Sequence, residues 1–489
     1  MTSAQRASRR RRSISASSSD SLLRSNVSYI RPRCESLSPI VGKIALMIML
    51  PLSISLMLTS FALGIFSLIP FLGFGAVTAL ICLLPITTYS IAWTIYLLLA
   101  QQDRPSHSLM GTPALARLIP FVPLAPLRCW KVAKATLSYL ASWLRYSTLA
   151  RGWLLTYLMY AKQHDDENLI YDAIPYAIPF FHQVLDVYPP HRSFRDAKQT
   201  KNKTLNHYGT YQGAPVLVLV PTPIVPVRLL SHRKAYLQIA IRLRNSGYCV
   251  VVPDIQYYPN ASIRDSVGDL RLALSWVGAH IASYGGNPAA IYTMGFGLSA
   301  HLVSLTLVQE AVALSQTVAL HTASTMGLED LESRLDRSRA QNFESYLPQV
   351  RLPQLAGVIL VAPLIDVVKG YRHEMALGVE HISYLRRSTG PTHAQCLSHS
   401  PSHLLQESKG SLDASFLPSK FLLIHGGNDR MIPLYHSALL KTLLDEAGVA
   451  KVELRAYRTL RHFEALACLA LPASPYASQI FADLRDFIC

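Results

Sequence analysis

The chain has 489 residues, of which 50% are hydrophobic, and this length accommodates one large domain together with further segments. Its formal net charge is +16 at pH 7, but no nucleic-acid-binding motif accompanies that charge, so a membrane surface is the expected partner and a nucleic acid is not. The seven cysteines are odd in number, scattered and without metal-ligand spacing. They argue against a disulfide framework and a metal site and fit a reducing compartment. We expect no cofactor.

Two apolar helices are predicted near the N-terminus. Residues 1–42 are basic and rich in serine, which predicts a disordered tail. From Ile44 to Gln102 there is no Asp, Glu, Lys, Arg or His, and one crossing of a bilayer needs only about 20 apolar residues. We therefore predict two transmembrane helices within residues 43–102, over 43–69 and 72–100. Basic residues flank this segment on both sides, so the positive-inside rule places both termini in the cytosol.

Residues 103–179 follow as a basic juxtamembrane region. Apolar residues recur in it at helical spacing, at Trp130, Ala133, Leu137, Leu140 and Leu144. This spacing predicts an amphipathic helix. Two placements are open for it: the helix lies on the bilayer surface, or it packs against the domain that follows.

From residue 180 to the end, strand patterns alternate with helix patterns, which predicts an α/β fold with a mostly parallel sheet covered by helices on both faces. Helices are expected between the strands, including one over 233–245 and a long amphipathic one that ends at Gly285 and Gly286. Residues 308–350 become polar toward their end and are predicted to be an insertion. The strands are predicted at 215–220, 248–253, 291–294, 357–362, 421–424 and 452–457.

A set of short phrases in residues 180–489 occurs in a characteristic order. They are LDVYP (185–189), YYP (257–259), ALSWV (273–277), YGGNP (284–288), AHL (300–302) and GVEHIS (378–383). In this order and spacing the chain resembles the α/β-hydrolase superfamily of esterases and lipases, and within it the prenylcysteine methylesterase-like carboxylesterases. The resemblance implies an α/β-hydrolase fold, chemistry on carboxylic esters and an endoplasmic reticulum membrane.

The resemblance also implies a catalytic acid and a catalytic base. Members of the superfamily carry a triad in the chain order Ser, Asp, His. Asp429, in the loop after the strand at 421–424, matches the acid, and His462, in the loop after the last strand, matches the base. In such a triad the histidine takes the proton of the serine hydroxyl, and the aspartate orients and stabilises the imidazolium.

The nucleophile position departs from the family. The serine of these enzymes lies in a sharp strand-to-helix turn with the pattern G-x-S-x-G, the nucleophile elbow. Here residues 295–299 read GFGLS, so Gly297 occupies the nucleophile position and Ser299 the second small position. Glycine suits the strained backbone of the turn but has no side chain that attacks a carbonyl carbon.

The loop that would stabilise the oxyanion departs as well. Active relatives carry glycines after the strand that corresponds to 215–220, and their backbone N–H groups bind the oxyanion. Here residues 221–227 read PTPIVPV, and proline has no N–H. The matching oxyanion positions are Thr222, Pro223 and Ile224 of this loop, with Leu298 after the elbow.

We therefore expect a membrane-anchored α/β-hydrolase-fold protein that is catalytically impaired and binds a lipid-like or ester ligand, or a protein partner that the sequence does not identify, through the inherited pocket. The alternative is an active carboxylesterase that uses Ser299 as a shifted nucleophile or a water molecule activated by His462. A shifted elbow would put His301 at a position that must be small, which argues against it.

Overall fold

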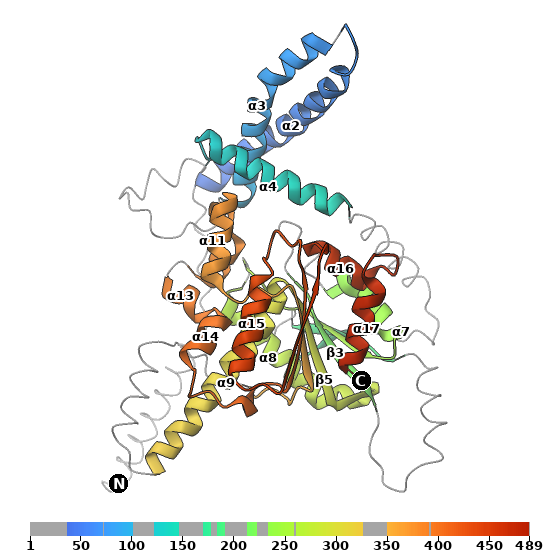
Figure 1. Cartoon of the computed structure of the whole chain (residues 1–489), viewed down its shortest axis with the longest axis vertical. Coiled ribbons are helices and arrows are strands. Elements are labelled where there is room, and N and C mark those ends of the chain that lie inside the picture. The colour runs from blue at the N-terminus through green and yellow to red at the C-terminus, as the bar shows by residue number, and fades with distance from the viewer. Residues whose placement is uncertain are drawn as a thin grey trace, which may run out of the picture.

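The computed structural model describes a hairpin of two long helices, an α/β domain and one further helix between them (Figure 1). The predicted N-terminal tail lies outside the described residues up to residue 36, as does the predicted insertion from residue 326 to 349. The segment 308–325 is helical and continues α9 (Leu298–Thr325). The described residues are 37–71, 73–100, 122–145, 170–177, 183–190, 213–222, 233–258, 261–325, 350–390 and 393–488.

The described strands form one eight-stranded sheet in the order β1-β2-β4-β3-β5-β6-β7-β8. β2 pairs antiparallel with β1 and with β4, and every other pairing in the sheet is parallel. The predicted mostly parallel sheet is thereby confirmed. The strands are β1 (Tyr171–Pro175), β2 (Val184–Tyr188), β3 (Ala214–Val220), β4 (Cys249–Pro253), β5 (Gly286–Phe296), β6 (Gly357–Val361), β7 (Lys420–Gly426) and β8 (Lys451–Tyr457).

β1 and β2 are the two strands that the sequence did not predict. β1 begins at Tyr171, upstream of the residue 180 at which the sequence places the start of the domain. β1 is largely exposed, so it lacks the apolar run by which a buried strand is recognised, and both strands are only five residues long.

Helices cover both faces of the sheet. Side chains that alternate along a strand point to opposite faces: Val216 and Val218 of β3 join one buried cluster, and Leu217 and Leu219 join the other. The first cluster contains residues of α8, α9, α14 and α15, and the second contains residues of α7, α16 and α17 (Figure 1). The helices of the domain are η4 (Arg233–Tyr236), α7 (Leu237–Asn245), α8 (Ile263–His280), η5 (Ile281–Tyr284), α9, α11 (Val367–Leu377), η6 (Glu380–Ile382), α12 (Tyr384–Thr389), α13 (His393–Ser398), α14 (Pro401–Glu407), η7 (Ala414–Phe416), α15 (Tyr435–Glu446), α16 (His462–Ala470) and α17 (Ala477–Ile488).

Two N-terminal helices, α2 (Leu37–Phe66) and α3 (Gly73–Leu99), are long and apolar enough to cross a membrane. They are held together partly by small polar side chains: the Ser53 hydroxyl lies 2.9 Å from that of Ser90 and 2.5 Å from that of Thr94. α9 is also long and apolar, but 67% of its apolar window is buried, against 6% in α2 and 22% in α3. We therefore describe α9 as a core helix of the domain.

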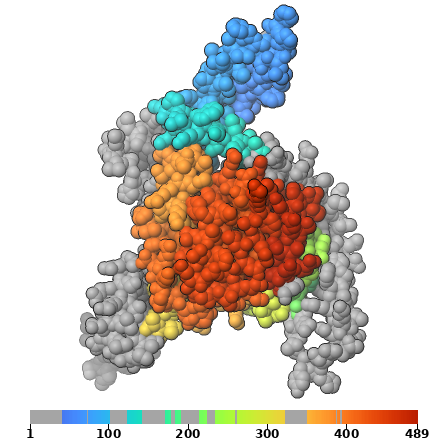
Figure 2. Space-filling model, in the orientation of Figure 1, coloured from blue at the N-terminus to red at the C-terminus, as the bar shows by residue number. Residues whose placement is uncertain are grey.

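α4 (Pro126–Arg145) lies between the hairpin and the domain. Figure 2 shows it as a band of atoms between the blue hairpin and the orange segment from α11 to α14, residues 367–407, which we call the cap. The Arg128 guanidinium lies 3.3 Å from the Glu380 carboxylate of the cap. The guanidinium of Arg387, also in the cap, donates to the carbonyl oxygen of Leu99 at the end of α3. The hairpin and α4 are thus tied to the domain through the cap.

Candidate active site

The turn from β5 into α9 has the geometry of an elbow. Gly297 stands between the two elements with a φ of +57°, in the left-handed region that favours glycine. Its backbone N–H donates to the Val361 carbonyl oxygen at 2.8 Å. A Cβ atom added at Gly295 would lie 2.6 Å from the Ala300 nitrogen, so only glycine permits so close an approach of strand and helix. The turn has the shape of an elbow, with glycine at the position where the family pattern has serine.

The acid and the base that the sequence singles out are joined by a hydrogen bond. His462 Nδ1 lies 2.7 Å from Asp429 Oδ2. The other carboxylate oxygen of Asp429 accepts from the backbone N–H groups of Met431 and Ile432, at 2.8 and 2.9 Å. An ionised carboxylate only accepts hydrogen bonds, so Nδ1 carries the proton and Nε2 is left as the acceptor.

The loops that carry these two side chains are fastened to each other by backbone contacts. The Gly427 N–H donates to the Tyr457 carbonyl oxygen at 2.8 Å, and the Asn428 N–H donates to that of Leu460 at 3.2 Å. A Cβ at Gly427 would lie 2.8 Å from the Arg458 carbonyl oxygen. The glycines after His425 therefore serve the close approach of two loops.

Burial by itself raises the pKa of Asp429, but the charge and hydrogen bond of His462 and the backbone N–H of Ile432 outweigh it, so the pKa is lowered below its usual value. Behind the pair lies His425, a fully buried residue whose place beside the acid the sequence did not predict. Its Nε2 donates to the Ile432 carbonyl oxygen at 2.8 Å, its Nδ1 accepts from the Ser437 hydroxyl at 2.7 Å, and burial lowers its pKa. His425 fixes the turn that holds Asp429. The feature of the sequence that could have identified His425 as a site residue is its position at the end of a buried strand.

The second nitrogen of His462 faces the place of the missing side chain. A Cβ added at Gly297 would lie 3.4 Å from His462 Nε2 and 3.8 Å from the Ile432 Cδ1 atom. These separations are ordinary van der Waals contacts, and a side chain at residue 297 would be strained only by the positive φ. A hydroxyl attached to that Cβ would come within hydrogen-bonding reach of the nitrogen.

Ser299, the shifted candidate, points into the elbow itself. Its side chain is fully buried. The hydroxyl accepts from the Phe296 N–H at 2.9 Å and donates to the Phe296 carbonyl oxygen at 3.1 Å. Both hydrogen bonds go to backbone within three residues, so in this arrangement the hydroxyl stabilises the turn.

The loop after β3 is described up to Thr222; Pro223 and Ile224 lie outside the described residues. The backbone N–H of Thr222 is already engaged, because it donates to the Tyr236 hydroxyl at 2.8 Å. The carbonyl oxygen of Pro221 accepts from the Tyr257 hydroxyl at 2.6 Å. At the other oxyanion position, Leu298 begins α9, where the first N–H groups of a helix have no partner within the helix.

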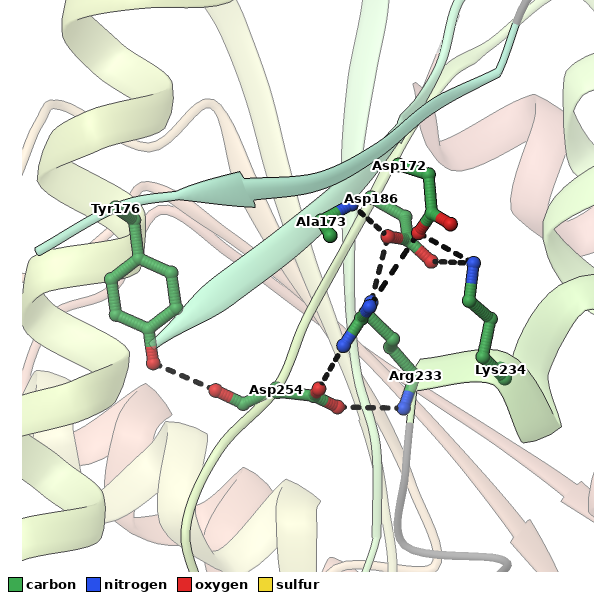
Figure 3. Close-up of polar contacts among 7 residues, drawn as sticks. All are labelled: Asp172, Ala173, Tyr176, Asp186, Arg233, Lys234 and Asp254. Atoms are coloured by element: carbon green, nitrogen blue, oxygen red, sulfur yellow. Dashed lines mark hydrogen bonds and ion pairs between the residues drawn. The ribbon is translucent and has the colours of Figure 1, made fainter. Parts of the chain in front are cut away.

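A partly buried ion network holds the chain where the description resumes after this loop (Figure 3). The Arg233 guanidinium lies 2.7 Å from Asp186 Oδ1 and also binds Asp254, whose Oδ1 accepts from the Arg233 backbone N–H at 2.8 Å. Lys234 binds Asp172 and lies 3.3 Å from Asp186. Burial raises the pKa of Asp186 to about 6. The network ties η4 to β1, β2 and the end of β4. The sequence did not predict it, since its members are separated by up to 82 residues.

Comparison with known proteins relates part of this chain to esterases. The family model described as BD-FAE matches residues 230–444. A probable isoprenylcysteine alpha-carbonyl methylesterase of Oryza sativa subsp. japonica is 27% identical over 221 residues, 45% of each chain. The isoprenylcysteine alpha-carbonyl methylesterase of Arabidopsis thaliana is 24% identical over 250 residues, 51% of each chain. The chain thus spans about half the length of the curated relatives it matches.

These matches support an α/β-hydrolase esterase family for the chain. Among solved structures, the chain is similar to esterase B from Lactobacillus rhamnosis, with a TM-score of 0.45, 18% identity, and coverage of 72% of this chain and 94% of that chain. Within the described residues, no group of three or more His, Cys, Asp or Glu side chains is placed to hold a metal ion.

Proposed function

We propose that this α/β-hydrolase has lost serine esterase activity and that its inherited pocket binds a lipid-like ligand. The observation that carries the proposal is Gly297. The position that faces His462 Nε2 holds no oxygen, and a triad without its nucleophile loses about 10⁶-fold in rate.

The loop after β3 supports the proposal independently. An oxyanion hole needs free backbone N–H groups aimed at the developing charge. Pro221 and Pro223 have none. Thr222 has one, but the Tyr236 hydroxyl accepts it. Chemistry that lacks both a nucleophile and these donors would be very slow.

The membrane part of the proposal rests on α2 and α3. We propose that both helices cross the bilayer and that both termini and the hydrolase domain lie in the cytosol, because basic residues flank the hairpin on both sides. The endoplasmic reticulum is proposed by resemblance to the prenylcysteine methylesterase-like proteins. A lipid-like ligand suits a site held beside a membrane, and the names of two curated relatives specify an isoprenylcysteine ester.

A second candidate function is slow ester hydrolysis by water. The space beside Gly297 borders His462 Nε2, and the other ring nitrogen of His462 is held by Asp429. In this reaction Nε2 takes a proton from a water molecule, the water oxygen attacks the ester carbonyl carbon, and the alcohol leaves with that proton.

The experiment is fluorophosphonate labelling and hydrolysis of p-nitrophenyl butyrate by the full-length protein in lipid nanodiscs. Wild type, Gly297→Ser and Gly297→Ala are compared. We expect no labelling of wild type and clear labelling of Gly297→Ser, because the serine hydroxyl would meet an oriented base. Gly297→Ala is the matched control, since it adds the same Cβ in the same backbone strain without the hydroxyl.

Two outcomes would contradict the proposal. Labelling of wild type that Ser299→Ala abolishes would establish the shifted nucleophile. Hydrolysis by wild type without labelling, lost in His462→Ala, would establish the water mechanism.

A further inference from the structure

α4 packs on the protein along one side and leaves large apolar side chains partly exposed next to it. Cys129, Val132 and Ala133 are buried in one cluster with Ile91 and Tyr96 of α3. Beside this buried line, large apolar side chains are exposed. They are Leu127, Trp130, Leu137 and Leu140, with exposed fractions of 67%, 54%, 40% and 39%. An apolar stripe of this kind on a surface helix is a mark of an interaction surface.

The level of α4 along the hairpin indicates what covers this stripe. A helix rises 1.5 Å per residue, so the roughly 30 Å hydrocarbon core takes about 20 residues. A crossing that begins at Gly73 therefore ends beside Trp93. Tyr89 and Trp93 are aromatic residues of the kind enriched at the membrane–water interface. The Tyr89 hydroxyl donates to the Leu124 carbonyl oxygen at 2.9 Å, and the Trp93 indole N–H donates to that of Pro123 at 2.8 Å. The residues that lead into α4 are thus hydrogen-bonded to α3 at the expected level of the membrane–water interface.

The charge of α4 also favours contact with a membrane surface. The helix contains Arg128, Lys131, Lys134 and Arg145 and no acidic residue. Lys131 and Lys134 are exposed. Long basic side chains can extend from an apolar surface to reach anionic lipid headgroups.

The protein side of α4 reaches both the cap and the base loop of the site. The Tyr139 ring meets that of Phe463, the neighbour of His462, edge to face with centroids 5.2 Å apart. Arg128 pairs with Glu380 at 3.3 Å, and the Lys131 side chain packs beside Gly378 of the cap. One helix therefore touches both structures that border the site.

We propose that α4 lies in the plane of the bilayer interface, with its Leu127–Leu140 stripe in the acyl boundary, and holds the His462 loop and the cap against the membrane. This inference rests on the proposed crossing of the hairpin.

The test is tryptophan quenching by brominated lipids in the full-length protein, in nanodiscs of phosphatidylcholine and phosphatidylserine. The difference between wild type and Trp130→Phe isolates Trp130 among the five tryptophans. Two controls are built on Trp130→Phe. Ile54→Trp reports the middle of α2, and Val318→Trp reports an exposed apolar site on α9, which runs away from the hairpin (Figure 1). Equal thermal unfolding midpoints confirm that the variants are folded.

We expect bromines near the headgroup end of the acyl chain to quench Trp130 about twofold more than Val318→Trp, and more than bromines at the chain terminus do. Ile54→Trp should show the reverse depth preference. If Ile54→Trp is quenched but Trp130 behaves like Val318→Trp, this inference is wrong and the hairpin crossing stands. If neither Ile54→Trp nor Trp130 is quenched, the proposed crossing fails and this inference fails with it.

Discussion

The two halves of the site differ in what they retain. In the acid–base half, Asp429 and His462 are hydrogen-bonded at 2.7 Å, and His425 fixes the turn behind them. In the elbow half, the backbone turn survives, but Gly297 carries no nucleophile and the Thr222 N–H is engaged by Tyr236. The comparison teaches that the backbone geometry of an elbow does not require a hydroxyl at its apex. A positive φ and a short strand-to-helix approach depend on glycine, whereas catalysis depends on one oxygen atom.

The sharpest test of the intact half uses Gly297→Ser as the background. Replacing Asp429 by Asn removes the carboxylate that fixes the Nδ1 proton of His462, and we expect the fluorophosphonate labelling rate to fall about 10⁴-fold, which is about 5.5 kcal/mol. The measurement is the second-order labelling rate constant. Asp445→Asn, on the exposed side of α15, is the control. Equal rates for Gly297→Ser with and without Asp429→Asn would mean that the acid–base half is not poised.

The next largest effect concerns the segment that follows the β3 loop. Arg233→Met should lower the unfolding free energy by about 3 kcal/mol, because it removes the closer of two cations beside the fully buried Asp186 and leaves only Lys234, 3.3 Å away. Denaturant titration of the detergent-solubilised protein measures the change. Arg485→Met, at an exposed side chain, should be nearly neutral. A loss below about 1 kcal/mol for Arg233→Met would show that the network is unimportant for stability.

A smaller effect concerns pH and the histidines buried around the site. Burial lowers the pKa of His436 to about 3, below its usual 6.5. A depressed pKa gives stability that is present above pH 6.5 and is lost progressively as the pH falls toward 3. Because His436 binds a proton in the unfolded state but not in the folded state over this range, we expect it to lower the unfolding free energy by about 2 kcal/mol as the pH falls from 7.5 to 5.

The contribution of His436 is measured as the difference between wild type and His436→Phe, because other buried groups also titrate in this range. Burial raises the pKa of Glu374 to about 7 and that of Asp186 to about 6, and these groups shift stability in the opposite sense. Unfolding midpoints of wild type and His436→Phe are therefore compared at both pH values. His436→Phe should lose less stability at pH 5. Parallel pH profiles would show that His436 does not titrate in this range.

The smallest effect is expected at Ser299. Ser299→Ala should lower the unfolding free energy by about 1 kcal/mol, because the hydroxyl bonds only to the Phe296 backbone among the described residues. In the Gly297→Ser background it should leave the labelling rate unchanged. A strong fall in that rate would assign Ser299 a role in the chemistry.

The sequence was informative where a property is local. A run without charge from Ile44 to Gln102 predicts two apolar helices, because every buried backbone group in a bilayer must be paired within its own helix. Alternating strand and helix patterns predict the parallel sheet, because each pattern reports which faces of its own element are buried. The sequence also shows directly that residue 297 is glycine and that prolines follow β3, because residue identity does not depend on packing.

Tertiary structure alone decided which distant residues meet. The antiparallel edge strands, the contacts of Arg233 with Asp186 and Asp254, and the bond from Thr222 to Tyr236 each depend on packing across separate elements. The sequence left α4 with two placements, and the structure packs one side of the helix on α3 while Leu127 and Trp130 stay more than half exposed. Periodicity specifies which face of a helix is apolar, but the partner of that face is chosen by the shape and charge of surfaces built from distant parts of the chain.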